Sequence, residues 1–244
     1  MIHARSLTFA YPGAGRPSLK NVTFDVPEGT VLCLCGVNGS GKSTLLSLLA
    51  GLYAPASGTL TVAGIASPGK EDKLRGLSAL VLQDADLQII GSTVAEDMLL
   101  AFPPGLTDAE ETARDMAARF DLAEHWHSPV HTLSYGQKRK LCLAVALLAS
   151  PALLLLDEPF SGLDYPAIRE MRAILANNRK HRLTQIISVH DLEPVIDLAD
   201  SMVVLHQGEQ VLAGTPQEVL DAIPAFGVRQ PCSWQRGLGI VPWE

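Results

Sequence analysis

The amino-acid sequence predicts an α/β fold with a mainly parallel central sheet. Two short and almost continuously apolar segments, at 30–36 and 152–158, have the pattern of buried strands. Stretches with helical periodicity lie between the apolar segments. Strands that alternate with helices pair in parallel, because each helix carries the chain back to the same edge of the sheet. The 244 residues suffice for one large domain, or for one domain with a small appendage.

The N-terminal segment predicts a separate set of antiparallel strands. Residues 2–32 alternate apolar and polar positions, and Pro-Gly and Glu-Gly turns interrupt the alternation. A helix is expected over 42–51, where Gly51 is placed to end it. We therefore expect an N-terminal antiparallel β-subdomain joined to the parallel sheet.

Two capping boxes predict the starts of helices in the middle of the chain. Thr107 and Glu110 form a T-x-x-E pattern at the start of an amphipathic stretch, which predicts a helix over 107–120. Ser134 and Gln137 form an S-x-x-Q pattern, which predicts a helix over 135–149. The remaining expected elements are strands at 58–64, 77–83, 183–190 and 201–214, and helices near 166–180, 192–199 and 216–222. The tail from residue 227 to 244 shows no period and is expected to be an irregular extension.

Composition narrows the class of partner and the compartment. The net charge of −7 argues against nucleic acid as a partner, because phosphate backbones require a basic surface. The four cysteines show no C-x-x-C spacing, and Cys33 and Cys35 are expected to be buried on one face of a strand in a reducing, cytoplasmic compartment. The longest apolar run, 141–156, is divided by Ser-Pro into halves that are too short to cross a bilayer.

A phosphate-binding loop is the strongest motif. The segment GVNGSGKST, residues 36–44, matches G-x-x-x-x-G-K-[ST] between a predicted strand and a predicted helix. Gly39 and Gly41 let backbone N–H groups turn towards a phosphate, and the helix N-terminus adds its positive dipole end. Lys42 would contact the β- and γ-phosphates, and the Ser43 hydroxyl would ligate Mg²⁺.

Polar residues end three of the predicted strands. Asp157 and Glu158 follow a buried strand, where an open α/β sheet places its ligands. Asp157 would hold Mg²⁺, and Glu158 would act as general base towards water. The alternative is a pair of solvated acids. His190 and Gln83 end two other strands, and either could be an ordinary strand-end residue or could point into the same crevice.

The motifs together resemble the nucleotide-binding subunits of ATP-binding cassette (ABC) transporters. The segment LSYGQ, residues 133–137, is similar to that family's LSGGQ signature, with Tyr135 in place of the first glycine. The resemblance covers residues 2 to 222. It implies an ABC-type P-loop ATPase domain at 2–226, with a helical subdomain at about 88–150 that carries the signature. It implies ATP and Mg²⁺ as ligands, with adenine stacking by Tyr11 and catalysis by Glu158 and His190. The metal would be bound by Ser43, Gln83 and Asp157, and further nucleotide contacts would come from Gln83, Ser134, Gly136 and Gln137. The phosphates would be bound by Gly36, Val37, Asn38, Gly39, Ser40, Gly41, Lys42, Ser43 and Thr44.

The resemblance also implies a partner subunit. Ser134 is expected to cap a helix whose free N–H groups point outward, which makes an anion site distant in sequence from the phosphate-binding loop. In the family, the two meet across a head-to-tail dimer that sandwiches ATP. The partner would be an identical chain or a homologue. Tyr135 could narrow the approach to the γ-phosphate or pack against the ribose.

The segment QDADLQ, residues 83–88, resembles a subgroup, the ATPases of energy-coupling factor importers for vitamins or transition-metal ions. The region Gln83–Asp97 is similar to the surface with which those ATPases receive the membrane subunit. Gln88 is therefore expected to be a docking residue. The alternative is a solvated polar side chain. The chain would then be peripheral on the inner face of the cell membrane. The other candidates are a conventional ABC importer or exporter ATPase, and a soluble ABC ATPase without a transport role.

Two further clusters allow competing interpretations. His125, His127 and His131 could form a metal site, although exposed loop histidines are more common. The basic run Lys-Arg-Lys at 138–140 is expected to be a solvated helix face, with contact to acidic loops or lipid headgroups as the alternative.

Overall fold

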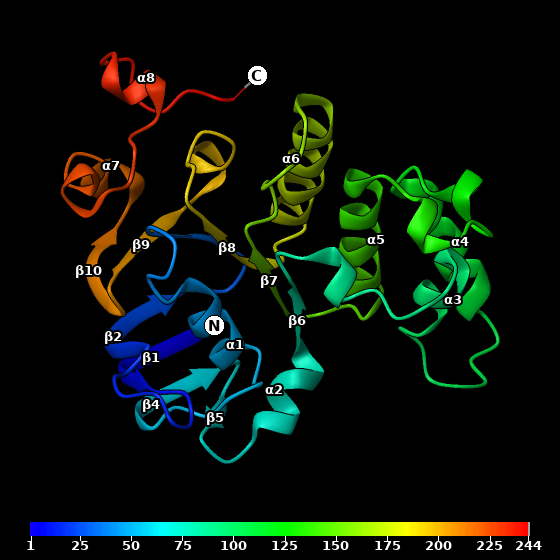
Figure 1. The fold of residues 1–244 in the computed structure, drawn as a ribbon, viewed down its shortest axis with the longest axis horizontal. Coiled ribbons are helices and arrows are strands. Elements are labelled where there is room, and N and C mark those ends of the chain that lie inside the picture. Colours follow the sequence, from blue (N-terminus) through cyan, green and yellow to red (C-terminus); the bar gives the residue numbers. More distant parts are fainter. Residues whose placement is uncertain (244) are drawn as a thin grey trace.

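A single ten-stranded sheet organises the computed structural model, which describes residues 1–243 (Figure 1). Strands β9, β3, β8, β7 and β6 pair in parallel, and β5, β4, β1 and β2 pair antiparallel. β10 joins the two parts, because it pairs with β9 and with β2. The predicted parallel sheet and antiparallel β-subdomain are therefore confirmed. The bounds are β1 Ile2–Phe9, β2 Leu19–Val26, β3 Val31–Cys35, β4 Ser57–Val62, β5 Ile65–Ser67, β6 Ser78–Val81, β7 Leu153–Asp157, β8 Thr184–Val189, β9 Ser201–His206 and β10 Glu209–Gly214.

The helices cover the sheet and extend it at one end. The bounds are α1 Lys42–Leu49, α2 Glu71–Leu77, α3 Val94–Leu99, α4 Ala109–Arg119, α5 Tyr135–Leu148, α6 Tyr165–Lys180, α7 Pro216–Val219 and α8 Cys232–Gln235. Helices α3, α4 and α5 pack on one another beyond β6, at the end of the molecule opposite the antiparallel strands (Figure 1). Within residues 1–243, no helix is both long enough and apolar enough to span a bilayer.

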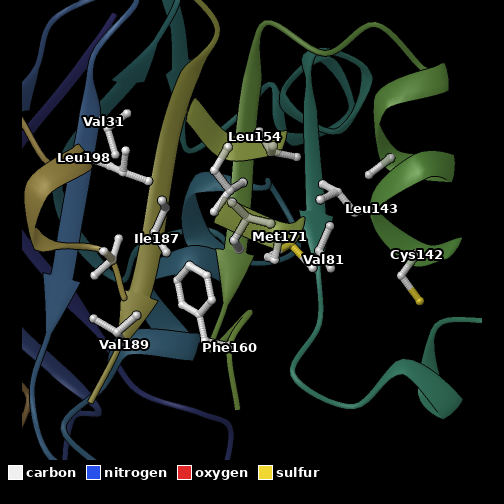
Figure 2. Close-up of a cluster of buried hydrophobic side chains, with 14 of the residues drawn as sticks. Val31, Val81, Cys142, Leu143, Leu154, Phe160, Met171, Ile187, Val189 and Leu198 are labelled. Carbon is white, nitrogen blue, oxygen red and sulfur yellow. The ribbon is translucent and has the colours of Figure 1, made fainter. Parts of the chain in front are cut away.

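The alternation of side chains along the parallel strands divides the core into two parts. Cys33 and Cys35 of β3 face one cluster of buried apolar side chains, and Leu32 and Leu34 face the other. Figure 2 shows part of the first cluster, where Phe160 packs against β8. The predicted burial of the two cysteines is confirmed.

Several predicted elements differ in the structure. The Thr107 capping box does not form, because α4 begins at Ala109 and Glu110 pairs instead with Arg114, one turn further along the helix. The predicted helix at 192–199 is reduced to a 3₁₀ turn at Ile196–Leu198, since Pro194 cannot donate a helical hydrogen bond. The segment 227–244, expected to be irregular, contains the short helix α8.

Candidate functional site

Glycine is required at two positions of the phosphate-binding loop, which runs from β3 to α1. A Cβ atom at Gly36 would lie 2.3 Å from the carbonyl oxygen of Leu205, and one at Gly41 would lie 2.8 Å from Leu19 Cδ2. Both residues also have positive φ angles, 153° at Gly36 and 107° at Gly41. The loop can therefore approach its neighbours and wrap around a ligand only with glycine at these positions.

A cavity of about 720 Å³ lies over this loop and the start of α1. Its size is in the range of small-molecule sites, and the N-terminus of α1 directs backbone N–H groups into it, so the residues present fit a polyphosphate. The cavity brings together residues from five separate parts of the chain, which are Ala14 to Ser18, Asn38 to Thr44, Gln83, Glu158, and Gln207 with Gly208.

Three predicted site residues form a chain of contacts that starts at the cavity wall with Lys42 and Glu158 and ends at His190, which lines a neighbouring hollow. Lys42 Nζ donates to the carbonyl oxygen of Gly36 at 2.8 Å and lies 3.1 Å from Glu158 Oε1. The other oxygen of Glu158 lies 2.7 Å from His190 Nδ1. Lys42 and Glu158 are both buried, so the ammonium and the carboxylate compensate each other's charge. A phosphate bound to Lys42 would compete with Glu158 for the ammonium group.

The Glu158 main chain adopts an unusual turn at the end of β7. Its φ angle is +49°, a region that non-glycine residues rarely occupy. Its amide donates to both the carbonyl and the hydroxyl oxygen of Ser188, and the same hydroxyl donates to Asp157. The turn directs the Glu158 side chain to Lys42 and leaves Asp157 buried against β8.

The predicted adenine-stacking residue lies beside the phosphate-binding loop. Tyr11 Oη is 3.2 Å from Thr44 Oγ1. Phe9 and Tyr53 contact the Tyr11 ring edge-to-face, with centroid separations of 5.0 Å and 5.4 Å. The three rings fix the orientation of Tyr11 while leaving 37% of it exposed.

The LSYGQ segment forms the predicted helix start. Ser134 caps α5, and its amide in turn donates to Gln137 Oε1 at 2.8 Å, so this capping box is confirmed. A second hollow, of about 390 Å³, is lined by Ser134, Tyr135, Gly136, Gln137 and the loop Gly162–Asp164. It does not include the phosphate-binding loop, so one chain presents its two predicted ATP-contacting surfaces in separate places.

The structure decides between the interpretations left open for two clusters, favouring exposed loop histidines for His127 and His131 and contact with acidic side chains for the basic run. His125 Nε2 is hydrogen-bonded to the Gln137 side chain, and within residues 1–243 no group of three His, Cys, Asp or Glu side chains is arranged to hold a metal ion. The basic run is not a solvated face: Lys138 pairs with Asp86, Lys140 pairs with Glu170, and Arg139 is 1% exposed. The Lys-Arg-Lys pattern in the sequence gives no signal that Arg139 is buried while its neighbours are not.

Residues 83–97, which are expected to receive the membrane subunit and are called the docking segment for that reason, fold into the 3₁₀ turn Ala85–Leu87 and the start of α3. The Gln88 side chain accepts a hydrogen bond from the amide of Leu82 at 2.8 Å, so it stabilises the end of β6 instead of pointing at a partner. The expectation that Gln88 itself docks is thus not supported by its geometry. The apolar side chains that the segment exposes are Leu87, 77% exposed, and Ile90, 82% exposed.

Sequence reasoning missed three residues that shape the site. Arg16 and Gln207 line the phosphate cavity. Ser188 holds both Asp157 and Glu158. The signal for Ser188 was a polar residue between the apolar residues Ile187 and Val189 of β8.

Comparison with known proteins adds independent information. The family described as ABC transporter matches residues 19–161, more than half of the chain. The chain is 36% identical over 242 residues to the cobalt import ATP-binding protein CbiO of Rhodobacter capsulatus, covering 95% of this chain and 85% of that protein. It is 34% identical over 233 residues to the energy-coupling factor transporter ATP-binding protein EcfA of Methanocaldococcus jannaschii, covering 91% and 82%. The solved structure of cbiO1 from Clostridium perfringens, described as part of the ABC transporter complex cbiONQ, aligns with a TM-score of 0.80 and 29% identity over 92% of both chains.

Proposed function

The chain belongs to the ABC transporter family, and we propose that it is the ATP-binding subunit that powers an importer of the energy-coupling factor type. It binds ATP and hydrolyses it. The observation that carries the proposal is the contact chain that runs from Lys42 and Glu158, at the wall of the phosphate cavity, to His190 in the neighbouring hollow. It places a base, an orienting group and a phosphate-binding cation within reach of one substrate.

Residues of the phosphate cavity and residues beside it would bind the substrate. The loop Gly36–Thr44 holds the phosphates of ATP through its backbone N–H groups and Lys42. Tyr11 stacks on the adenine, supported by its aromatic neighbours. Ser43, Gln83 and Asp157 offer oxygen ligands of the kind that Mg²⁺ prefers. When bound, the ion would neutralise negative charge on the phosphates.

Hydrolysis requires Glu158 to accept a proton from water. Binding of a phosphate at Lys42 releases Glu158 Oε1 from its ion pair, so the carboxylate becomes available as a base. His190 keeps hold of Oε2 and orients the group. Because the base is formed by displacement, its activation depends on nucleotide in the cavity.

The second subunit follows from the separation of the two hollows. Ser134, Gly136 and Gln137 line a surface that their own chain's phosphate-binding loop does not reach. A second copy, or a homologue, arranged head-to-tail brings this surface to the γ-phosphate and completes each site.

The membrane partner contacts the docking segment, on the exposed side chains of Leu87 and Ile90. The chain thereby lies on the inner face of the cell membrane without crossing it. The proposed transported substrate is a transition-metal ion or a vitamin, and the likeness to the cobalt import protein favours the metal ion.

The test is to tag this chain, solubilise native membranes gently, identify the co-purifying proteins and measure ATP hydrolysis by the complex with and without EDTA. We expect a small substrate-binding membrane protein and a second coupling membrane protein, with hydrolysis that EDTA abolishes. Recovery with a large conventional permease would reject the subgroup, and recovery with soluble partners alone would reject transport.

A further inference from the structure

We infer that Arg139 is a positioning residue for ATP hydrolysis, which fixes the main-chain turn at Glu158 and links it to the signature helix α5. The inference rests on the proposed function, because Glu158 is the base there. Arg139 is among the largest side chains that the fold buries fully, at 1% exposure. Burying an arginine is costly unless its donors are used, so its contacts deserve an explanation.

The guanidinium group of Arg139 bonds to two main-chain carbonyls. Nη1 donates to the oxygen of Leu82 at 2.6 Å, and Nη2 donates to the oxygen of Glu158 at 2.7 Å. Leu82 directly follows β6 and Glu158 directly follows β7, and these strands are parallel neighbours. One planar group on a helix thus ties together the carboxyl ends of two strands, which a single ammonium group cannot reproduce with the same geometry.

The turn at Glu158 needs such support. A φ angle of +49° persists at a non-glycine residue only where the surroundings impose it. Ser188 holds the amide side of Glu158 and Arg139 holds the carbonyl side. If the carbonyl is released, the turn can relax, which moves the Cα–Cβ bond and carries the carboxylate away from Lys42 and His190.

The same arginine connects this turn to the surface that meets the partner's nucleotide. Ser134 caps α5, and Arg139 lies in the second turn of the same helix. The Tyr135 ring lies 5.5 Å from Arg139 Cζ, and its hydroxyl is 3.4 Å from the carbonyl oxygen of Gln83. Helix α5 packs on β6 through apolar side chains such as Leu143 and Val81 (Figure 2). A shift of α5 when Ser134 engages a phosphate therefore reaches the base through Arg139.

The first test compares Arg139→Lys and Arg139→Met with the wild-type chain. Arg114→Met is the control for the loss of an arginine that lies over an aromatic ring in the helical region, because the more exposed Arg114 contacts Glu110 and not the cavity. We expect kcat for ATP hydrolysis to fall at least tenfold in both Arg139 variants. MgATP affinity, measured by equilibrium binding, should not fall by more than twofold, since Arg139 contacts neither Lys42 nor its loop. A kcat within twofold of wild type in either folded variant would overturn the inference, as would an equal fall in the control.

A double-mutant cycle separates positioning from a merely structural role. If Arg139 acts through Glu158, Arg139→Met should have no further effect on single-turnover hydrolysis in a Glu158→Gln background. Multiplying losses would overturn the inference. If the methionine variant unfolds, as thermal unfolding would reveal, Arg139→Lys carries the same cycle. Wild-type chain that hydrolyses no ATP in its complex would instead refute the proposed function.

Discussion

Replacing Asp97 by alanine should weaken assembly with the membrane subunits while leaving ATP hydrolysis intact. Asp97 is 5% exposed, and its Oδ1 accepts from the amides of Ile90 at 2.8 Å and Gly91 at 2.9 Å. These two bonds hold the loop that presents Leu87 and Ile90. The carboxylate therefore shapes the docking segment without contacting a partner itself.

The expected loss of assembly affinity follows from the two hydrogen bonds that Asp97 accepts. Hydrogen bonds to a charged group contribute roughly 1.5–3 kcal/mol each, so their joint loss costs about 3–6 kcal/mol. The Ile90 side chain is largely exposed, so water can reach the freed amides, and the lower end, about 3 kcal/mol, is the better figure. At about 1.4 kcal/mol per tenfold, assembly should weaken by up to about 100-fold. Asp97→Asn keeps an acceptor oxygen but loses the charge, so we expect about a tenfold loss.

The assay is surface plasmon resonance of each variant against detergent-solubilised membrane subunits, with ATP hydrolysis by the free chain measured in parallel. Hydrolysis should remain within twofold, because Asp97 lies outside the phosphate cavity. Assembly of Asp97→Ala at wild-type affinity would refute the reasoning. A parallel loss of hydrolysis would show that the substitution disturbs more than the loop.

Three further expectations concern the site and the core. Glu158→Gln should lower kcat by about 10²–10⁴, the usual contribution of a general base, yet retain ATP and trap a dimer on size-exclusion chromatography; wild-type turnover would remove Glu158 from its role. Lys42→Ala should abolish ATP binding measured by calorimetry and lower the melting temperature, because it leaves Glu158 buried without its cation, and unchanged affinity would contradict the phosphate cradle. Burial raises the pKa of Cys35 and Cys142 to about 12, so native chain at pH 8 should leave both unlabelled by iodoacetamide. Since the unfolded thiols ionise near pH 9 and the folded ones do not, the urea midpoint should fall as pH rises from about 9 towards 12, and labelling or a pH-independent midpoint would count against this burial.

Some of these features were accessible in the sequence because they depend on neighbouring residues. The phosphate-binding loop, from Gly36 to Thr44, needs only its own glycines and the flanking strand and helix. The Ser134 box needs only residues three apart. The apolar runs of β3 and β7 predicted buried parallel strands, because a continuous apolar run is also a property of neighbouring residues. The Thr107 box shows the limit of such patterns, since a competing pair between Glu110 and Arg114 forms there instead.

The sequence by itself thus determined the family motifs, the class of fold and the residue types of the site. Only the tertiary structure decided how distant segments combine. It paired Lys42 with Glu158, turned Gln88 inward to the end of β6, and buried Arg139 between two strand ends. The physical reason is that the contacts of Lys42 and Arg139 join groups far apart in the chain. A charged or amide side chain also looks the same in sequence whether water or a buried main-chain group satisfies it.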